Sequence, residues 1–226
     1  MPNILYIGNK NYSSWSLRPW LVLRWAKIPF EERLIRLDQQ GYGRQAIDEV
    51  LRVSPNGRVP CLHADDLVVW DSLAIAEWAA ETYPTAALWP ADKKRRSQAR
   101  SATAEMHSGF SNVRNDLPMN IRGRVEPQNW RPETRAEIAR LDVLWKDLRT
   151  RHAGDGPFLF GARTIADAFY APVATRMRTY GVALSAPAQA WCEAIFADPD
   201  FRDWESASAP DSWDASGFSV IDRKYA

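Results

Sequence analysis

The sequence has few of the residues that mark a disulfide-bonded, metal-binding, membrane-spanning or nucleic-acid-binding protein. Among its 226 residues are two cysteines, Cys61 and Cys192, which lie far apart and show no CxxC or metal-ligand spacing. No apolar run approaches the ~18 residues of a membrane-spanning helix. The formal net charge of +1 is too small to indicate a binding surface for nucleic acid or an anionic membrane. We therefore expect no metal, no membrane and no nucleic-acid partner, and a reducing cytoplasm as the location.

What the chain does have is material for a large core. Hydrophobic residues make up 46% of it, and eleven are tryptophans. The tryptophans fall mostly at helix-face positions, which predicts core packing; examples are Trp20, Trp78, Trp145 and Trp191. The one basic cluster, residues 93–96, is interpreted as a solvated helix face. The N-terminus lacks a basic leader and a long apolar core, so no secretory signal is expected.

The first third of the chain alternates between strand and helix patterns. An apolar run at residues 3–7 predicts a strand, periodicity over 17–27 predicts a helix, and alternation over 31–37 predicts a second strand. Strand, helix, strand implies a right-handed parallel crossover. A weaker helical pattern at 42–52 and a helix at 72–83 follow. The pattern predicts an α/β first domain.

The rest of the chain gives only helical signals. Pro84 and Pro90 bracket a polar linker at residues 84–91. Long periodic segments predict helices at 92–122, 132–152, 164–180 and 187–197. We therefore expect an all-helical second domain over residues 92–226, joined by the linker to a first domain over residues 1–83.

One of these helix starts has a specific capping pattern. Thr164 stands at the N-cap position, and Asp167, three residues on, can reach back to the N–H of Thr164. We interpret this motif as structural. Loss of the Asp167 carboxylate should cost about 1 kcal/mol or more if the helix start is buried.

A β-hairpin is predicted where Pro60 begins a short strand. Two apolar segments, 60–64 and 67–70, flank a two-residue turn. Proline is tolerated at a strand start, and an X-Pro bond in a tight turn is where a cis peptide is most plausible. A cis bond would turn the N–H and C=O of Val59 outward, where an extended ligand could pair with them as an added strand.

Just after this hairpin, Asp71 and Ser72 precede an apolar-periodic run, which is typical of a helix N-terminus. Free backbone N–H groups at that end attract a carboxylate, and the Ser72 hydroxyl can add a hydrogen bond. Asp71 would suit a ligand ammonium. The pair fits the two ends of a free amino acid or a γ-glutamyl group; the alternative is that Ser72 only caps its helix.

These residues, with a serine-rich loop after the first strand, resemble the cytosolic glutathione transferases. The likeness covers nearly the whole chain, and the loop at residues 13–18 is most similar to the zeta and theta-type serine enzymes, with Trp15 where zeta enzymes carry a cysteine. The resemblance implies a thioredoxin-like first domain, glutathione as co-substrate, a small hydrophobic electrophile and a homodimer.

In such an enzyme a serine hydroxyl donates a hydrogen bond to the glutathione sulfur and so stabilises the thiolate, which is the nucleophile. Three loop serines compete for that role. Ser16 directly precedes Leu-Arg-Pro and is interpreted as the helix cap. Counting back four residues from Arg18 favours Ser14, whereas the zeta double serine favours Ser13. Ser14 is our first candidate, and Ser13 stays open.

The resemblance also implies how the tripeptide is held. Val59 would pair through its main chain, Asp71 and Ser72 would hold the γ-glutamyl end, and Gln40 or Arg58 would contact the glycine carboxylate. The last two are weaker inferences, because a solvated Arg58 is an equal alternative.

The electrophile pocket is expected between the serine loop and the first long helix of the second domain. Trp15, Met106, His107 and Phe110 are its candidate residues. If the predicted helix is continuous, Met106 and Phe110 share one face. The alternative for these two is an ordinary core position.

Three functional hypotheses follow. The first is a glutathione transferase acting on a small electrophile. The second is a glutathione-dependent isomerase of the maleylacetoacetate type, suggested by the double serine. The third is a non-catalytic glutathione-transferase-like binding module, against which the retained serine loop and Asp71-Ser72 argue. The sequence does not identify the electrophile.

Overall fold

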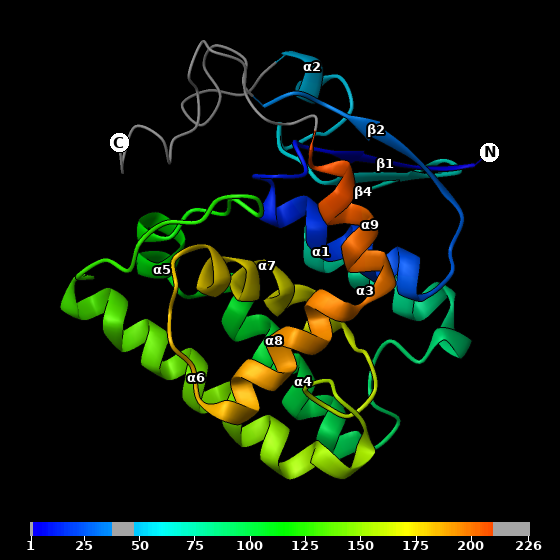
Figure 1. Cartoon of the computed structure of the whole chain (residues 1–226). Helices are drawn as coiled ribbons and strands as arrows, with labels where there is room; N and C mark the ends of the chain where they lie inside the picture. Colours follow the sequence, from blue (N-terminus) through cyan, green and yellow to red (C-terminus); the bar gives the residue numbers. More distant parts are fainter. Residues whose placement is uncertain (1, 38–47, 210–226) are drawn as a thin grey trace.

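A small sheet at one end of the molecule rests on two helices, and a larger group of helices lies beneath them (Figure 1). The computed structural model describes residues 2–37 and 48–209. The four strands have the order β2-β1-β3-β4. Their bounds are β1 (Asn3–Ile7), β2 (Phe30–Leu34), β3 (Cys61–Ala64) and β4 (Leu67–Val69). β1 and β2 are parallel, whereas β3 is antiparallel to both β1 and β4.

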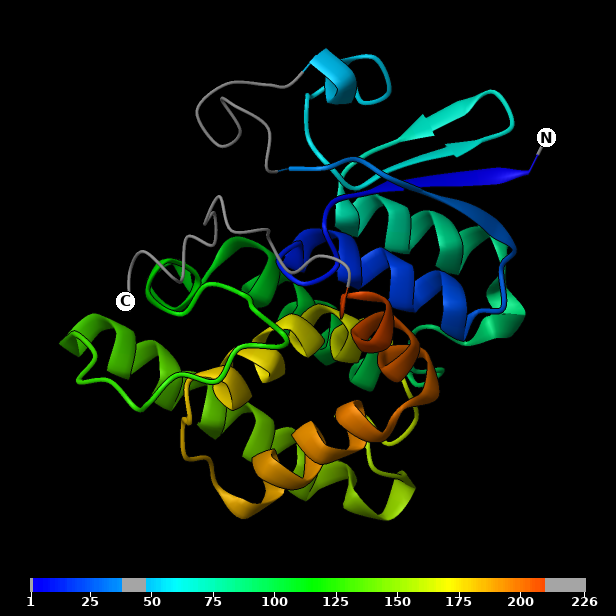
Figure 2. The same cartoon turned by 45° about the horizontal axis from the view of Figure 1, so that its top comes forward.

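The helices of this first part are α1 (Ser14–Trp25), α2 (Asp48–Leu51) and α3 (Ser72–Thr82). Figure 2 shows α1 and α3 side by side under the sheet, with α2 beyond its other face. The parallel β1-α1-β2 unit and the β3-β4 hairpin give the expected thioredoxin-like domain. β2 begins one residue before the predicted 31–37 strand and ends at Leu34, because its partner β1 ends at Ile7. Of the predicted helix at 42–52, residues 42–47 lie outside the described residues.

The hairpin forms as predicted. The Val59–Pro60 peptide bond is cis, and β3 begins directly after it at Cys61. Ala64 pairs with Leu67 across the turn residues Asp65 and Asp66. Cys61 is fully buried, and burial raises the pKa of its thiol.

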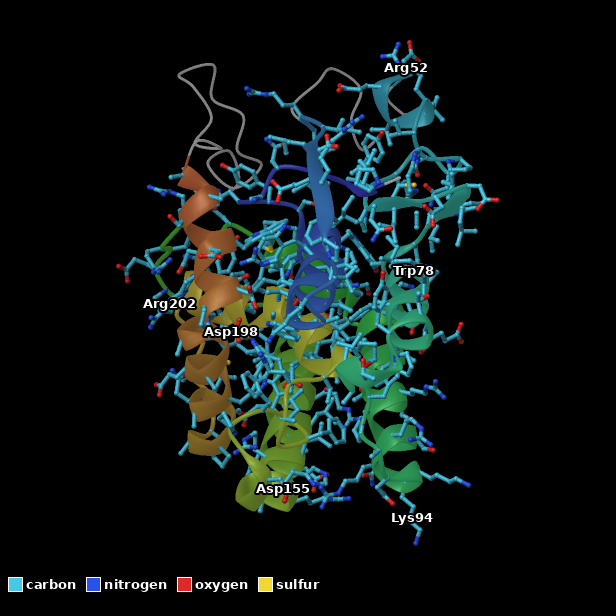
Figure 3. The ribbon with its side chains drawn as sticks, turned by 90° about the vertical axis from the view of Figure 1, so that its right-hand side faces the viewer. Arg52, Trp78, Lys94, Asp155, Asp198 and Arg202 are labelled. Carbon is cyan, nitrogen blue, oxygen red and sulfur yellow. The ribbon has the colours of Figure 1, made fainter. Side chains whose placement is uncertain are left out.

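In the described residues of the second part the regular elements are helices, apart from two isolated β-bridges at residues 158–162, and η1 (Pro84–Ala86) lies in the predicted linker segment. Its helices are α4 (Lys93–Ser108), α5 (Ser111–Asp116), α6 (Pro132–His152), α7 (Ile165–Thr179), α8 (Ala186–Ala197) and α9 (Pro199–Ala207), with η2 (Ala153–Asp155) after α6. The bounds of α6 match the prediction, and those of α7 and α8 lie within a residue of it. α9 was not predicted, although Asp198 followed by Pro199 is an N-cap signal. Asp198, labelled in Figure 3, accepts from Asp200 N and Phe201 N.

The prediction of one continuous helix over 92–122 is wrong. Gly109 is extended and Phe110 takes a left-handed conformation with φ of 58°, so α4 ends and α5 begins anew. The Arg114 guanidinium caps the end of α4 by donating to the carbonyl oxygens of Met106, His107 and Gly109. Met106 and Phe110 therefore do not share a helix face, and both lie in the core.

The core centres on α7, which contacts α1, α4 and α8. Trp145 and Trp191 are fully buried and Trp20 nearly so, as expected for core residues, whereas Trp78 is half-buried at the core edge. Asp167 at the start of α7 accepts from the N–H groups of Leu159 and Thr164, the Thr164 hydroxyl and the Trp191 indole. The predicted contact from Asp167 back to Thr164 is thus confirmed.

The outer surface of α4 carries the basic cluster. Lys93 and Lys94 are exposed, and Figure 3 shows Lys94 pointing away from the ribbon. Arg95 pairs with Asp155 at 2.7 Å, and Arg96 donates to the carbonyl of Pro90 at 3.0 Å. In the described residues, none of the helices is long and apolar enough to cross a membrane.

Candidate active site

The loop between β1 and α1 brings three serines to the start of a buried helix. Ser13, not Ser16, is the N-cap of α1: its hydroxyl accepts from Ser16 N at 3.4 Å and donates to Ser16 Oγ at 2.8 Å. Ser16 lies in the first helical turn, and its hydroxyl accepts from Gly8 N at 3.0 Å. Our interpretation of Ser16 as the cap was therefore wrong, since α1 begins at Ser14, three residues before the predicted start at residue 17.

Ser14 is the first residue of α1 and differs from its neighbours in having a free hydroxyl. Its backbone N–H donates to Tyr12 O at 3.0 Å. Within the described part of the chain no hydrogen bond reaches Ser14 Oγ, although the residue is buried. The hydroxyls of Ser13 and Ser16 are hydrogen-bonded to each other, so Ser14 is the loop serine whose hydroxyl is available to a ligand.

The second part of the molecule fixes this loop in place. Asn11 Nδ2 donates to Asn120 Oδ1 at 2.8 Å, and Arg122 N donates to Asn11 Oδ1 at 3.1 Å. From the other side, Trp204 of α9 donates its indole N–H to Lys10 O at 2.9 Å. Figure 1 shows α9 lying beside α1. The position of the serines therefore depends on residues far along the sequence.

Trp15 stands between two arginines. The guanidinium of Arg18 lies 4.1 Å from its ring centroid and that of Arg114 lies 4.7 Å away. The Trp15 ring also meets His107 edge-on at 5.5 Å. Trp15 is 38% exposed, whereas Arg18 is fully buried. The ring contact places Trp15 of α1 beside His107 of α4.

Arg18 was not identified as a site residue from the sequence. It is fully buried, and none of its guanidinium nitrogens has a hydrogen-bond partner in the described residues. Burial lowers its pKa well below the usual value, and Arg114 and Arg176 add to the effect. The sequence signal that could have identified it is the position of this charged residue in the otherwise apolar segment 17–23 of the predicted helix.

At the start of α3, Asp71 caps the helix and the Ser72 hydroxyl is left without a partner in the described residues. Asp71 is the N-cap, and its Oδ1 accepts from Leu73 N at 2.9 Å and from Ala74 N at 3.4 Å. Ser72 does not cap the helix. Its hydroxyl is buried and has no partner in the described residues. A buried hydroxyl without a partner costs free energy, so Ser72 Oγ is a position where a ligand atom would be stabilised.

His107 connects α4 to this helix start. Its Nε2 lies 3.1 Å from Asp71 Oδ2, and its Nδ1 is buried without a partner in the described residues. Burial lowers the pKa of His107, and the nearby Arg18 and Arg114 act in the same direction, while Asp71 opposes them. The imidazole is therefore held mainly neutral near pH 7.

The remaining candidates differ in burial and in hydrogen bonding. The main chain of Val59 has no hydrogen bond within the described residues, and the Arg58 side chain is exposed. Gln40 lies outside the described residues. Met106 and Phe110 are 1% and 7% exposed, which makes them core residues in this structure. In the described part of the chain, no group of three His, Cys, Asp or Glu side chains could hold a metal ion.

Comparison with known proteins finds a matching family model and several sequence relatives. Residues 12–82 match the family model described as the glutathione S-transferase N-terminal domain. A maleylacetoacetate isomerase of Pseudomonas aeruginosa is 27% identical over 92% of this chain and 98% of its own length. A maleylacetoacetate isomerase of Mus musculus is 31% identical, but the match covers only 56% of this chain and 57% of that relative.

Among solved structures, a glutathione transferase homologue from Burkholderia with bound glutathione superposes with a TM-score of 0.70. That match is 24% identical and covers 94% of this chain and all of the other, so it establishes the fold. Residues 12–82 are therefore similar to a glutathione S-transferase N-terminal domain. The chain as a whole has the fold of the glutathione transferases.

Proposed function

We propose that this chain is a glutathione transferase, which binds glutathione and transfers its thiolate to a small hydrophobic electrophile. The observation that carries the proposal is the free Ser14 hydroxyl at the first turn of α1. A hydroxyl there can donate to a sulfur anion, and the positive end of the helix dipole favours the same charge. The Ser13 hydroxyl donates its hydrogen bond to Ser16, which supports Ser14 as the hydrogen-bond donor to the glutathione sulfur.

The γ-glutamyl end would lie at the start of α3. Ser72 Oγ offers an unpaired donor, and the N-terminus of α3 attracts a carboxylate. The free main chain of Val59 suits the cysteinyl residue of an extended tripeptide. Asp71 would take the ammonium, which then shares Oδ2 with His107. Gln40 or Arg58 remains our proposal for the contact with the glycine carboxylate.

In the reaction, the glutathione thiol loses its proton to solvent, and the sulfur then forms a bond to the electrophilic carbon. That carbon releases a leaving group with its bonding electrons or, where it belongs to an activated double bond, the π bond opens and the product takes up a proton from solvent. Serine acts only as a hydrogen-bond donor, because its own hydroxyl stays protonated near neutral pH. Trp15 and His107 would line the electrophile side of the pocket. For the chain as a whole we propose the division into residues 1–83, 84–91 and 92–226, a homodimer and a cytoplasmic location.

The proposal is tested by ultraviolet titration of the thiolate in the glutathione complex. We expect bound glutathione to ionise at a lower pH than the free thiol, whose pKa is about 8.5. An unchanged ionisation pH would contradict catalysis by thiolate activation. Failure to bind immobilised glutathione would instead favour a non-catalytic module.

A second candidate activity is a glutathione-dependent cis-trans isomerase. It is supported by the relatives named maleylacetoacetate isomerase, among them the one from Pseudomonas aeruginosa that spans nearly the whole chain. Here the thiolate would add to a conjugated double bond, the resulting single bond would rotate, and elimination would regenerate the thiolate. Incubation with a cis-enedione distinguishes the two, because an isomerase converts it without consuming glutathione.

A further inference from the structure

Arg18 is the most unusual polar group in the described part of the chain. It combines full burial with three guanidinium nitrogens that lack hydrogen-bond partners. Its immediate surroundings are two aromatic rings, those of Trp15 at 4.1 Å and Phe169 at 5.1 Å. A guanidinium is not deprotonated in proteins, so it remains a buried cation that needs a nearby anion.

The charges around Arg18 do not supply that anion in full. Asp71 is the carboxylate that acts on it, but both oxygens of Asp71 are already used by the start of α3 and by His107. Arg114 and Arg176 add two further positive charges. Arg176 is satisfied by the carbonyl oxygens of Arg114 and Leu117, whereas Arg18 has no such contact. This region therefore has an excess of positive charge.

The position of Arg18 on α1 indicates which anion would balance it. Arg18 follows Ser14 by four residues, so the two side chains lie on one face of the helix. Side chains spaced in this way have Cβ atoms about 5–6 Å apart, and a helical side chain leans toward the N-terminus. The guanidinium is thus directed toward the turn that carries the free Ser14 hydroxyl.

We propose, building on the glutathione transferase function above, that Arg18 supplies the buried positive charge that stabilises the glutathione thiolate beside Ser14. Arg18 acts through the electric field in a dry interior and is not itself in contact with solvent. Trp15 covers the guanidinium, which keeps water from screening it. The thiolate would supply the missing anion, so the free protein carries an unbalanced charge that the ionised complex neutralises.

This role differs from a structural one in its effect on the free protein. A structural arginine contributes hydrogen bonds, and its loss lowers the melting temperature. Arg18 has no hydrogen bonds to lose, and replacing an unpaired buried cation by an apolar side chain of similar size is often neutral or stabilising. We therefore expect the glutathione-free Arg18→Met variant to melt at or above the temperature of the wild type.

The test is the thiolate titration of bound glutathione in the wild type, Arg18→Met, Arg18→Lys and Arg24→Met. Arg24 lies on the same helix, but its partners are Asp200 and Asp203 on the surface, so it controls for net charge. We expect the thiol pKa to rise by about one unit or more in Arg18→Met, to rise less in Arg18→Lys and to stay unchanged in Arg24→Met.

The outcomes separate this inference from the function on which it rests. If the wild type does not lower the thiol pKa, thiolate activation itself fails. If the wild type lowers it and Arg18→Met lowers it equally, Arg18 is not the counter-charge. Should Arg18→Met fail to fold, Arg18→Gln gives the same comparison with a polar side chain. An Arg18 variant that melts well below the wild type while keeping its thiol pKa would assign a structural role.

Discussion

His107 Nε2 lies 3.1 Å from Asp71 Oδ2, which links the last turn of α4 to the N-cap of α3. Asp71 Oδ1 accepts from Leu73 N at 2.9 Å, so both carboxylate oxygens have partners before any ligand binds. A ligand ammonium must therefore share Oδ2 with the imidazole. The protonation state of His107 therefore affects both the stability of the N-terminus of α3 and the binding of the tripeptide.

The first prediction concerns the pH dependence of stability. Burial lowers the pKa of His107 in the folded protein below its value of about 6.5 in the unfolded chain. As the pH falls below that value, the unfolded chain takes up the proton first, so the free energy of unfolding decreases. Above it both states are neutral, and this contribution does not change.

Replacing His107 with glutamine should flatten the decrease in melting temperature between about pH 7.5 and 5.5. His152, whose pKa is also lowered by burial, contributes in the same direction, so His152→Gln and the double variant complete the set. A His107→Gln protein with the full wild-type pH slope would contradict this assignment.

The second prediction separates the two serines of the loop. Ser14→Ala should slow conjugation roughly tenfold to a thousandfold with nearly unchanged glutathione affinity, because it removes a charge-stabilising donor. Ser13→Ala should instead lower stability by about 1 kcal/mol, since Ser13 is the N-cap of α1. Steady-state kinetics and urea unfolding measure the two effects. A fully active Ser14→Ala protein with an inactive but folded Ser13→Ala protein would reverse the roles.

The third prediction concerns the γ-glutamyl end. Ser72→Ala should weaken glutathione binding about tenfold or more, while kcat stays close to the wild type, because a hydrogen bond to a ligand carboxylate is lost. The free protein should keep its melting temperature, since Ser72 Oγ has no partner in the described residues. Calorimetric titration and thermal unfolding test both parts. A lower melting temperature without a loss of affinity would contradict the ligand role.

The fourth prediction concerns the start of α7. Asp167→Asn should cost about 2 kcal/mol or more of unfolding free energy, because one carboxylate accepts hydrogen bonds from four donors there. Asp147→Asn is the matched control, since Asp147 pairs with Arg151 on an exposed face of α6. Urea unfolding of the two variants gives the comparison. Equal losses would mean that the buried cluster contributes no more than a surface ion pair.

Local signals were sufficient for much of the fold. Pro60 at a strand entry predicted both the hairpin and the cis bond, and the periodic segment at residues 132–152 predicted α6 to the residue. The continuous 92–122 helix failed because Arg114 caps α4 through its side chain, which no periodicity reveals. α9 was missed although Asp198-Pro199 marked its start.

The candidate site was only partly predictable. Asp71 and Ser72 were recognised from their place before an apolar run, but which of them caps the helix depends on side-chain geometry. The contact between His107 and Asp71, and the unpaired state of Arg18, arise from elements that meet only in the folded chain. Such relationships have no short-range signature. The free Ser14 hydroxyl was distinguishable only after Ser13 and Ser16 were seen to bond to each other.

The hydrogen bond from Trp204 to Lys10 O has a consequence for how the protein is made. The segment before the serines is among the first to be synthesised, whereas Trp204 leaves the ribosome almost two hundred residues later. A nascent chain lacking α9 can form the sheet but lacks this support for the loop. The hydrogen bond that supports the loop before the serines is therefore available only after residue 204 has emerged.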